Sequence, residues 1–212
     1  YISSSGLDPK GKKSKQVFVM DFDGESSRQL TSHKGFVFSP AISHDGTKVA
    51  YSVIENRNGK NNINLYLYDL SVSKSKLISS LKGINSGAVF LPGDEKIALT
   101  LTHSGNAEIY IMSLDDKSLR PLTNHWASDV DPSISPNGKN LVFLSGRSGK
   151  PMIYMMNTEG REKDVRRISY VGEFNATPRF SRDGEKIILS SWLDNRFDLF
   201  MIGINGDGLA RL

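Results

Sequence analysis

The sequence predicts an all-β fold, an incomplete β-propeller of four-stranded antiparallel blades, with about five blades present. Three observations predict it. A turn motif recurs around Gly46, Gly93, Gly138 and Gly184, at spacings of 47, 45 and 46 residues. Strand-like segments follow each turn, and no window holds a sustained apolar stripe of helical period. Repeats of this length occur in solenoids, propellers and arrays, and four strands per repeat favour the propeller.

The first strand of each repeat carries a proline motif that ends in a turn. It reads SPAISHDG over 39–46, DPSISPNG over 131–138 and TPRFSRDG over 177–184, with a degraded copy, GAVFLPGD, over 87–94. The closing glycine suits the positive φ that a tight hairpin needs. Because the same acidic residue recurs, we interpret Asp45 and Asp183 as turn formers rather than catalytic groups.

Three further strands complete each repeat, since β-branched and aromatic residues alternate there at period two. The strands after the turn are predicted over 48–52, 96–100, 140–144 and 186–190. The next strands are predicted over 64–69, 108–113, 152–157 and 198–203. Short closing strands are predicted over 76–78, 120–123, 167–169 and 211–212.

The N-terminal part reads as a blade without its first strand, with strand-like segments at 1–5, 16–24 and 28–31. We therefore expect residues 1–212 to form one incomplete propeller domain, with a partial first blade and four further blades. A propeller closes so that no long sheet edge stays exposed. Part of the propeller is accordingly expected to lie outside this chain.

Composition narrows the function classes. The chain has 212 residues, 38% hydrophobic content, a formal net charge of +4 and no cysteine. Its basic run, Lys10–Lys15, lacks the aromatic interleaving of single-strand binders, so we interpret it as a solvated loop and expect no nucleic-acid partner. No segment has the apolar length of a membrane span, so no direct membrane insertion is expected. Without cysteine, disulfides and thiol chemistry are excluded.

A search for catalytic, cofactor and metal sites finds none. The segment Ser145–Lys150 fits neither the Gly-x-Ser-x-Gly elbow nor a phosphate loop, and we interpret it as a hairpin loop. The four histidines lie in separate repeats without metal-ligand spacing. The glycosylation sequon at Asn175 is interpreted as a chance occurrence. We predict no catalytic residue, no cofactor and no metal.

The segments that join one blade to the next are the candidate binding surface. In a propeller they cross one face and turn toward the central channel, and loops on a rigid scaffold often carry function. Large aromatic residues there are typical recognition anchors, although packing between blades is an equal alternative for Trp126 and Phe174. The candidate partner-binding residues of these segments are Phe36, His125, Trp126, Asp129, Phe174 and Asn175.

The repeat resembles the propeller of the TolB family, a periplasmic component of the Tol–Pal envelope system. The resemblance rests on Leu-Thr, a polar loop, the Pro-x-Ile/Phe-Ser-x-Asp/Asn-Gly motif, an apolar strand and Ile-Tyr-x-Met. Examples are Leu30-Thr31 before Pro40 and Leu122-Thr123 before Pro132. The opening segment, Val19–Gly24, also resembles the first blade of that family, so the match spans essentially the whole chain.

This resemblance implies a six-bladed propeller preceded by a small α/β domain, so the last blade and the α/β domain are expected to lie outside this chain. It also implies a non-enzymatic periplasmic scaffold that supports outer-membrane integrity, protein transport and cell division. Its partners would be the peptidoglycan-associated lipoprotein Pal, bound at the channel mouth, and TolA, reached through an N-terminal segment that is not in this chain. The family's Pal-contacting positions match Ile84, Asn85 and Gly87 in one blade, and Val130 and Asp131 in another. The first set departs from the family pattern, because Ala88 replaces a proline and Ile84 replaces a usually polar residue.

Two other functions stay open on the sequence. Related blades form the gating propellers of prolyl-oligopeptidase-like serine peptidases, whose hydrolase domain would then be missing from this chain. The chain could also be a general scaffold with an unrelated ligand in its channel.

Overall fold

The computed structural model describes residues 2–57 and 59–212, and its elements are nineteen strands and one three-residue 3-10 helix, η1 (Glu162–Asp164). The predicted all-β class is therefore confirmed. Tyr1 of the expected first segment and Asn58 of a predicted loop lie outside the described residues. Within the described part of the chain, no helix is long enough to cross a membrane.

The strands form one three-stranded and four four-stranded antiparallel sheets, which are the blades of a β-propeller. Blade one contains three strands: β1 (Ile2–Leu7), β2 (Lys13–Val19) and β3 (Arg28–Gln29). Blade two contains β4 (Val37–Ile42), β5 (Lys48–Arg57), β6 (Lys60–Asp69) and β7 (Lys74–Ser79). Blade three contains β8 (Asn85–Phe90), β9 (Lys96–Leu101), β10 (Glu108–Ser113) and β11 (Leu119–Pro121).

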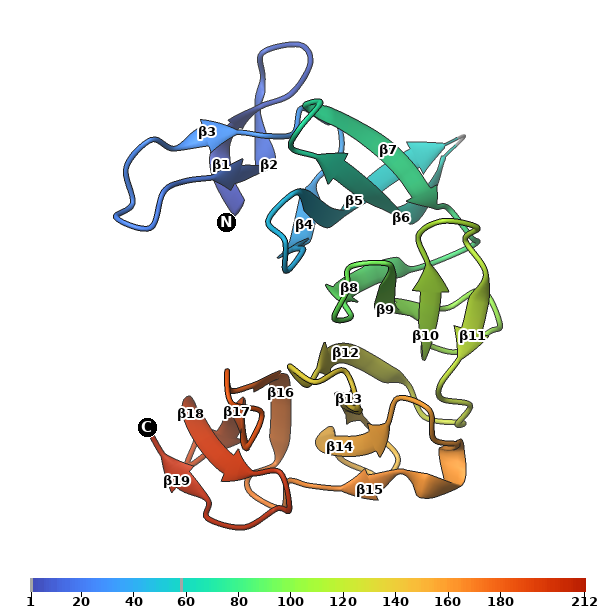
Figure 1. The fold of residues 1–212 in the computed structure, drawn as a ribbon, viewed down its shortest axis with the longest axis vertical. Helices are drawn as coiled ribbons and strands as arrows, with labels where there is room; N and C mark the ends of the chain where they lie inside the picture. The colour runs from blue at the N-terminus through green and yellow to red at the C-terminus, as the bar shows by residue number, and fades with distance from the viewer. Residues whose placement is uncertain (1, 58) are drawn as a thin grey trace. The chain divides into compact units, whose positions relative to one another are not determined.

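The last two blades repeat the same order of strands. Blade four contains β12 (Asp129–Ile134), β13 (Asn140–Ser145), β14 (Met152–Asn157) and β15 (Arg166–Arg167). Blade five contains β16 (Phe174–Phe180), β17 (Lys186–Leu193), β18 (Arg196–Gly203) and β19 (Ala210–Arg211). Figure 1 shows the sheet of each blade as a separate group of arrows.

The chain forms two compact units, Tyr1–Ala88 and Val89–Leu212. Each unit has its own core, made where the apolar faces of successive blades meet. In the first unit, Val17 and Leu30 of blade one pack in one cluster with Val37, Tyr51 and other residues of blade two. This burial is the main favourable contribution to folding of the unit.

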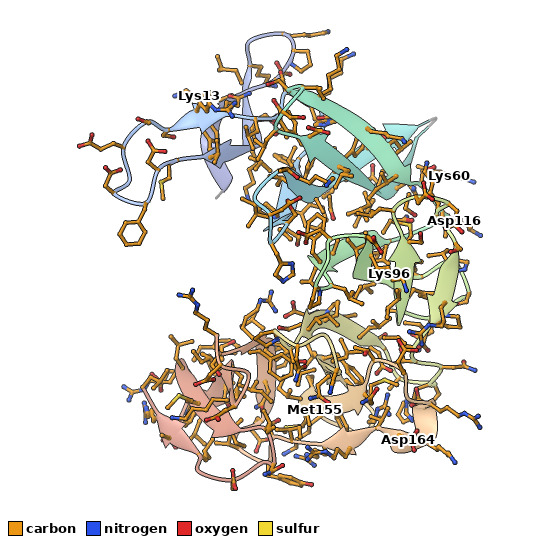
Figure 2. The ribbon with its side chains drawn as sticks, in the orientation of Figure 1. Lys13, Lys60, Lys96, Asp116, Met155 and Asp164 are labelled. Carbon is orange, nitrogen blue, oxygen red and sulfur yellow. The ribbon has the colours of Figure 1, made fainter. Side chains whose placement is uncertain are left out.

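The second unit contains two such clusters. In one of them, Ile109 of blade three packs with Phe143 of blade four. In the other, Ile153 and Met155 of blade four pack with Leu189 of blade five, and Figure 2 labels Met155 on β14. Because successive strand residues point to opposite faces of a sheet, blade four packs against both neighbours.

The predicted turns form with the expected chemistry. In the first turn the Ser43 hydroxyl donates to Asp45 Oδ1 over 2.6 Å, the Thr47 N–H donates to the same oxygen over 2.9 Å, and Gly46 has φ +69°. The equivalent bonds recur at Ser135 with Asn137, over 2.7 Å. Each acidic or amide side chain therefore holds a hairpin turn, as its recurrence predicted.

In the degraded repeat the predicted position of the turn is wrong by one residue. The N–H of Gly46 donates to the carbonyl of Ser43, and the corresponding bond in blade three runs from Asp94 to Leu91. Asp94, with φ +58°, thus occupies the position of Gly46, and Gly93 occupies that of Asp45. The error arose because an aspartate tolerates the left-handed conformation that the motif otherwise gives to glycine.

The proline motif forms a bulged strand rather than a regular one. The strand register shifts between Val130 and Ser133 in blade four, with corresponding shifts in blades two and five. The residue before the proline takes a left-handed conformation in each case, with φ +49° at Ser39 and +56° at Asp131. In blade three, Gly87 adopts φ +65° before Ala88. A bulge of this kind bends a strand and redirects its side chains.

The hairpin of β5 and β6 is longer than predicted. Its strands pair from Lys48 with Asp69 to Arg57 with Lys60, so each has ten residues, whereas β9, β10, β13 and β14 have six. The Asn-Gly dipeptide at 58–59, which favours a two-residue turn, explains the extension, and Gly59 has φ +78°. Blade two therefore carries an additional ribbon.

Candidate functional site

Three candidate residues occupy one equivalent position, two residues before the left-handed residue of the bulge. They are Asn85, Asp129 and Asn175, and all three are fully buried. The sequence assigned them to connecting segments, but they are the first or second residues of β8, β12 and β16. The predicted start of each of these strands lies too late in the sequence, because the chain also pairs with the following strand on the N-terminal side of the bulge. Their side chains can therefore act on a partner only by positioning the loops around them.

Asn85 holds the connection that precedes it. Its Nδ2 donates to the carbonyls of Leu81 and Ile63 over 2.7 and 2.8 Å. Its Oδ1 accepts from the Ser79 hydroxyl over 2.6 Å and from the Leu81 N–H over 3.0 Å. A buried amide with these partners satisfies backbone groups that would otherwise be unpaired.

Asn175 acts similarly in blade five. Its Nδ2 donates to the Val171 carbonyl over 2.8 Å and to the Ser191 hydroxyl over 3.0 Å. A glycosyl group at this nitrogen would displace both bonds and have no room. The structure therefore supports the interpretation of the sequon as a chance occurrence.

Asp129 is the buried member of a charge cluster, which we call the Arg147 cluster: Asp129, Arg147 and Glu162. Arg147 Nη2 lies 2.7 Å from Asp129 Oδ2, and Nη1 lies 2.8 Å from Glu162 Oε1. The guanidinium also lies over the rings of Phe143 and Tyr154, 5.4 and 5.1 Å from their centroids. This combination of paired charges and cation–π contacts fixes the start of β12.

Burial raises the pKa of Asp129 to about 6, and the nearby Glu108 and Glu162 carboxyls act in the same direction. The Arg147 charge lowers that pKa but does not offset the loss of hydration. At neutral pH the carboxyl is therefore ionised and paired with Arg147.

This raised pKa gives a testable pH dependence. The folded state binds the Asp129 proton more tightly than the unfolded state, whose pKa is near 3.8. The contribution of Asp129 to the free energy of unfolding should therefore fall by up to about 3 kcal/mol as pH rises from 4 to 6, and stay constant above. Urea unfolding of the native protein and of Asp129→Asn across this range should give curves that differ in slope. Parallel curves would contradict the assignment.

His125 and Trp126 lie on a loop that a buried carboxylate holds. Glu108 Oε1 accepts the His125 N–H over 2.9 Å, and Glu108 Oε2 accepts the Thr123 hydroxyl over 2.6 Å. Asn106 Nδ2 donates to the His125 carbonyl over 2.8 Å. The Trp126 side chain is 77% exposed beside the His125 ring, with centroids 5.3 Å apart. The loop thus presents a large apolar ring to solvent on a fixed backbone.

The remaining candidates differ in exposure. Phe36 is exposed in the first unit, and Ile84 is just exposed there. Gly87 and Val130 are half-buried in β8 and β12. Asp131 is half-buried, and its Oδ1 lies 3.2 Å from Arg179 Nη1, which joins blades four and five.

Sequence reasoning missed an aromatic row in blade five. Phe174 pairs with Trp192, which pairs with Phe197, and all three side chains are partly exposed. The Phe174 and Phe197 centroids are 6.0 Å apart, and those of Trp192 and Phe197 are 5.0 Å apart. The predicted strand ended at Ser190, so Trp192 was placed in a loop. The Asp-Asn dipeptide at 194–195, a two-residue turn with positive φ at both positions, was the signal that could have revealed the pairing.

A search of the described residues finds no group of three or more His, Asp or Glu side chains that could hold a metal ion. The histidines take part in protein contacts instead: His33 Nε2 lies 3.0 Å from the Tyr51 hydroxyl.

Comparison with known proteins agrees with this geometry. A family profile described as "TolB beta propeller domain" matches residues 1–212. The Tol-Pal system protein TolB of Francisella tularensis is 28% identical over 191 residues, which are 89% of this chain and 43% of that protein. The crystal structure of TolB from Acinetobacter baumannii matches with a TM-score of 0.80 and 29% identity, over 93% of this chain and 48% of that one.

The chain thus spans less than half the length of these two relatives. A puromycin-hydrolysing peptidase of Mycobacterium tuberculosis shares the fold alone, with a TM-score of 0.75 at 14% identity over 99% of this chain and 37% of that one. The chain belongs to the TolB β-propeller domain family.

Proposed function

We propose that this chain is the propeller of a non-enzymatic, periplasmic scaffold of the Tol–Pal system. It would bind the peptidoglycan-associated lipoprotein Pal through exposed residues of the connections between blades, with TolA engaged by a segment outside the chain. Outer-membrane integrity, protein transport and cell division would be the processes served. The Tol-Pal naming of the Francisella relative supports this proposal.

The observation that carries the proposal is the exposed Trp126 on its fixed loop. Large aromatic rings supply much of the buried area at protein interfaces and cost little side-chain entropy. The bonds from Glu108 and Asn106 hold the loop before any partner arrives. Preorganisation of this kind lowers the entropic cost of binding.

The other candidate residues fall into two groups in this proposal. The exposed side chains of Phe36, Ile84 and Phe174 would contact a partner. The buried Asn85, Asp129 and Asn175 would hold the connections, and Gly87, Val130 and Asp131 would form the bulges that direct them.

Replacing Trp126 with alanine is expected to weaken binding of Pal by about 2 kcal/mol, or about thirtyfold, because an anchor ring loses its buried contacts. Titration calorimetry with the soluble domain of Pal measures this. Phe22→Ala is the control, since Phe22 is a fully exposed aromatic residue outside the connections between blades. Unchanged affinity in a folded Trp126→Ala protein would remove Trp126 from the site.

We also propose that a further blade covers blade five in the full-length protein. Ile109, Ile153 and Leu199 are equivalent, because their carbonyls accept N–H groups from Leu122, Ile168 and Leu212. Ile109 and Ile153 are fully buried against the next blade, whereas Leu199 is 53% exposed. An apolar side chain at this recurrent packing position supports a propeller with more blades than the five described.

A further inference from the structure

A pocket in the first unit is built by features that the other blades do not share. Its volume is about 890 Å³, within the usual range for sites that bind small molecules. One wall is the ribbon formed by the extended ends of β5 and β6, which contributes Ile54, Glu55, Asn56 and Asn61. Figure 2 labels Lys60 at the end of this ribbon.

The floor of the pocket is the connection 32–36, which is rigidly attached. Gln16 is fully buried and clamps His33, with Nε2 donating to the His33 carbonyl over 2.8 Å and Oε1 accepting the His33 N–H over 3.1 Å. At Gly35 a Cβ would lie 1.8 Å from the Ile54 carbonyl oxygen, so only glycine allows this close approach. The Ile54 N–H donates to the Phe36 carbonyl over 2.9 Å.

Because these backbone groups are hydrogen-bonded within the protein, a ligand in the pocket would contact side chains instead. The backbone groups of His33 and the Phe36 carbonyl already have partners within the chain. A peptide could therefore not pair with these groups as a further strand, since strand addition needs free backbone donors and acceptors. The ring of Phe36 and the amides of Asn56 and Asn61 line the pocket instead.

The polar groups of the pocket are held in place by neighbours. Glu55 Oε1 accepts the Tyr66 hydroxyl over 2.7 Å, and Oε2 accepts from Asn64 Nδ2 over 2.5 Å. Asn56 Nδ2 donates to Asn61 Oδ1 over 2.9 Å. The Asn61 amide nitrogen has no acceptor among the residues that the structure describes. Carboxylate and amide groups fixed in this way suit a ligand that both donates and accepts hydrogen bonds.

The charges of the lining favour an uncharged ligand. The lining residues include one lysine, Lys34, and one acidic residue, Glu55. Burial lowers the pKa of His33, although Glu55 opposes this, so the imidazole is neutral at pH 7. A strongly anionic or cationic ligand would therefore be repelled by one of these two side chains as well as attracted by the other.

We infer that this pocket binds an uncharged saccharide, with the apolar face of a sugar ring on Phe36 and its hydroxyl groups on Glu55, Asn56 and Asn61. The Phe36 side chain is 58% exposed and can cover such a face. A sugar ring has one apolar face and a rim of hydroxyl groups, which matches an exposed aromatic ring beside fixed amides and a carboxylate. This site shares Phe36 with the partner surface proposed above, but binding of the saccharide requires neither Pal nor Trp126.

Ligand-observed NMR with the unliganded protein tests the site, followed by calorimetry. The probes are maltotriose, cellotriose and triacetylchitotriose as neutral saccharides, trigalacturonate as an anionic one, and penta-alanine for main-chain binding. At least one neutral trisaccharide is expected to bind more tightly than trigalacturonate and penta-alanine. No binding of the neutral probes at millimolar concentration would overturn the inference, as would tighter binding of the anionic probe or of penta-alanine.

Variants locate the binding. Phe36→Ala is expected to weaken it about tenfold, and Asn61→Ala about fivefold, since each removes one contact. Both side chains are exposed, so circular dichroism should show an unchanged fold. Phe22→Ala, which removes an exposed ring outside the pocket, is the matched control and should leave the affinity unchanged. Equal loss in Phe22→Ala, or no loss in the pocket variants, would place the saccharide elsewhere and overturn the inference.

Discussion

Replacing Arg147 with alanine is expected to lower the free energy of unfolding by about 3–5 kcal/mol, because it leaves the buried carboxylate of Asp129 without its partner. Arg147 Nη2 lies 2.7 Å from Asp129 Oδ2, and the Asp129 side chain has no exposed surface. Asp129 Oδ1 already has no hydrogen-bond partner among the described residues. The substitution also removes the guanidinium from the faces of Phe143 and Tyr154.

Urea unfolding at pH 7 measures this effect. Arg196→Ala is the matched control, because Arg196 also pairs with an aspartate, Asp198, but is mostly exposed. Its loss should cost no more than about 1 kcal/mol, as is usual for ion pairs at the surface. Adding Asp129→Asn to Arg147→Ala should recover part of the loss, since an amide is less costly to bury than an unpaired charge. If Arg147→Ala and Arg196→Ala have equal effects, the cluster is not a stabilising element.

The sequence predicted the blades well because their signals are local. Turn residues such as Asp45 and Gly46 interact with groups a few positions away, so the spacing of the motif is enough to place each hairpin. Alternating apolar residues likewise place the strands. The bulges were not predicted, since the shift of register at Asp131 leaves the proline motif unchanged and depends on pairing with β13.

The candidate site was harder to predict, because a polar residue in a connection has two uses. Asn85 and Asn175 pair with backbone groups of their own loops and are buried, whereas the sequence placed them on a surface. Nothing in the local pattern separates these roles. For Trp126 the sequence left packing between blades as an equal alternative, and the side chain is exposed on its loop.

The pocket in the first unit illustrates another limit of sequence reasoning. Its parts come from segments that are distant in sequence, the connection at 32–36 and the ribbon at 54–61. The sequence around Gly35 does not show that glycine is required there, because the close approach to Ile54 exists only after the strands have paired. A search for motifs detects residues with fixed spacing and does not detect this arrangement.

Replacing Gly172 with alanine is expected to lower the free energy of unfolding by about 3 kcal/mol, through two separable causes. Gly172 has φ +69°, a conformation that costs an alanine about 1–2 kcal/mol. A Cβ there would also lie 2.2 Å from Ser191 Oγ and 2.5 Å from the Trp192 carbonyl oxygen. The second contact is with backbone of β17 and cannot be relieved by a change of rotamer, so the connection must move.

Gly46→Ala separates the two causes. Gly46 has the same φ, +69°, but a Cβ there meets nothing within 4 Å, so only the conformational cost of about 1–2 kcal/mol should appear. The difference between the two variants in urea unfolding then measures the contact of the 170–173 connection with β17. Because Asn175 is bonded to this connection through Val171, Gly172→Ala should also speed hydrogen exchange at Asn175. Equal destabilisation by the two substitutions would mean that the connection is loosely packed and does not fix the start of β16.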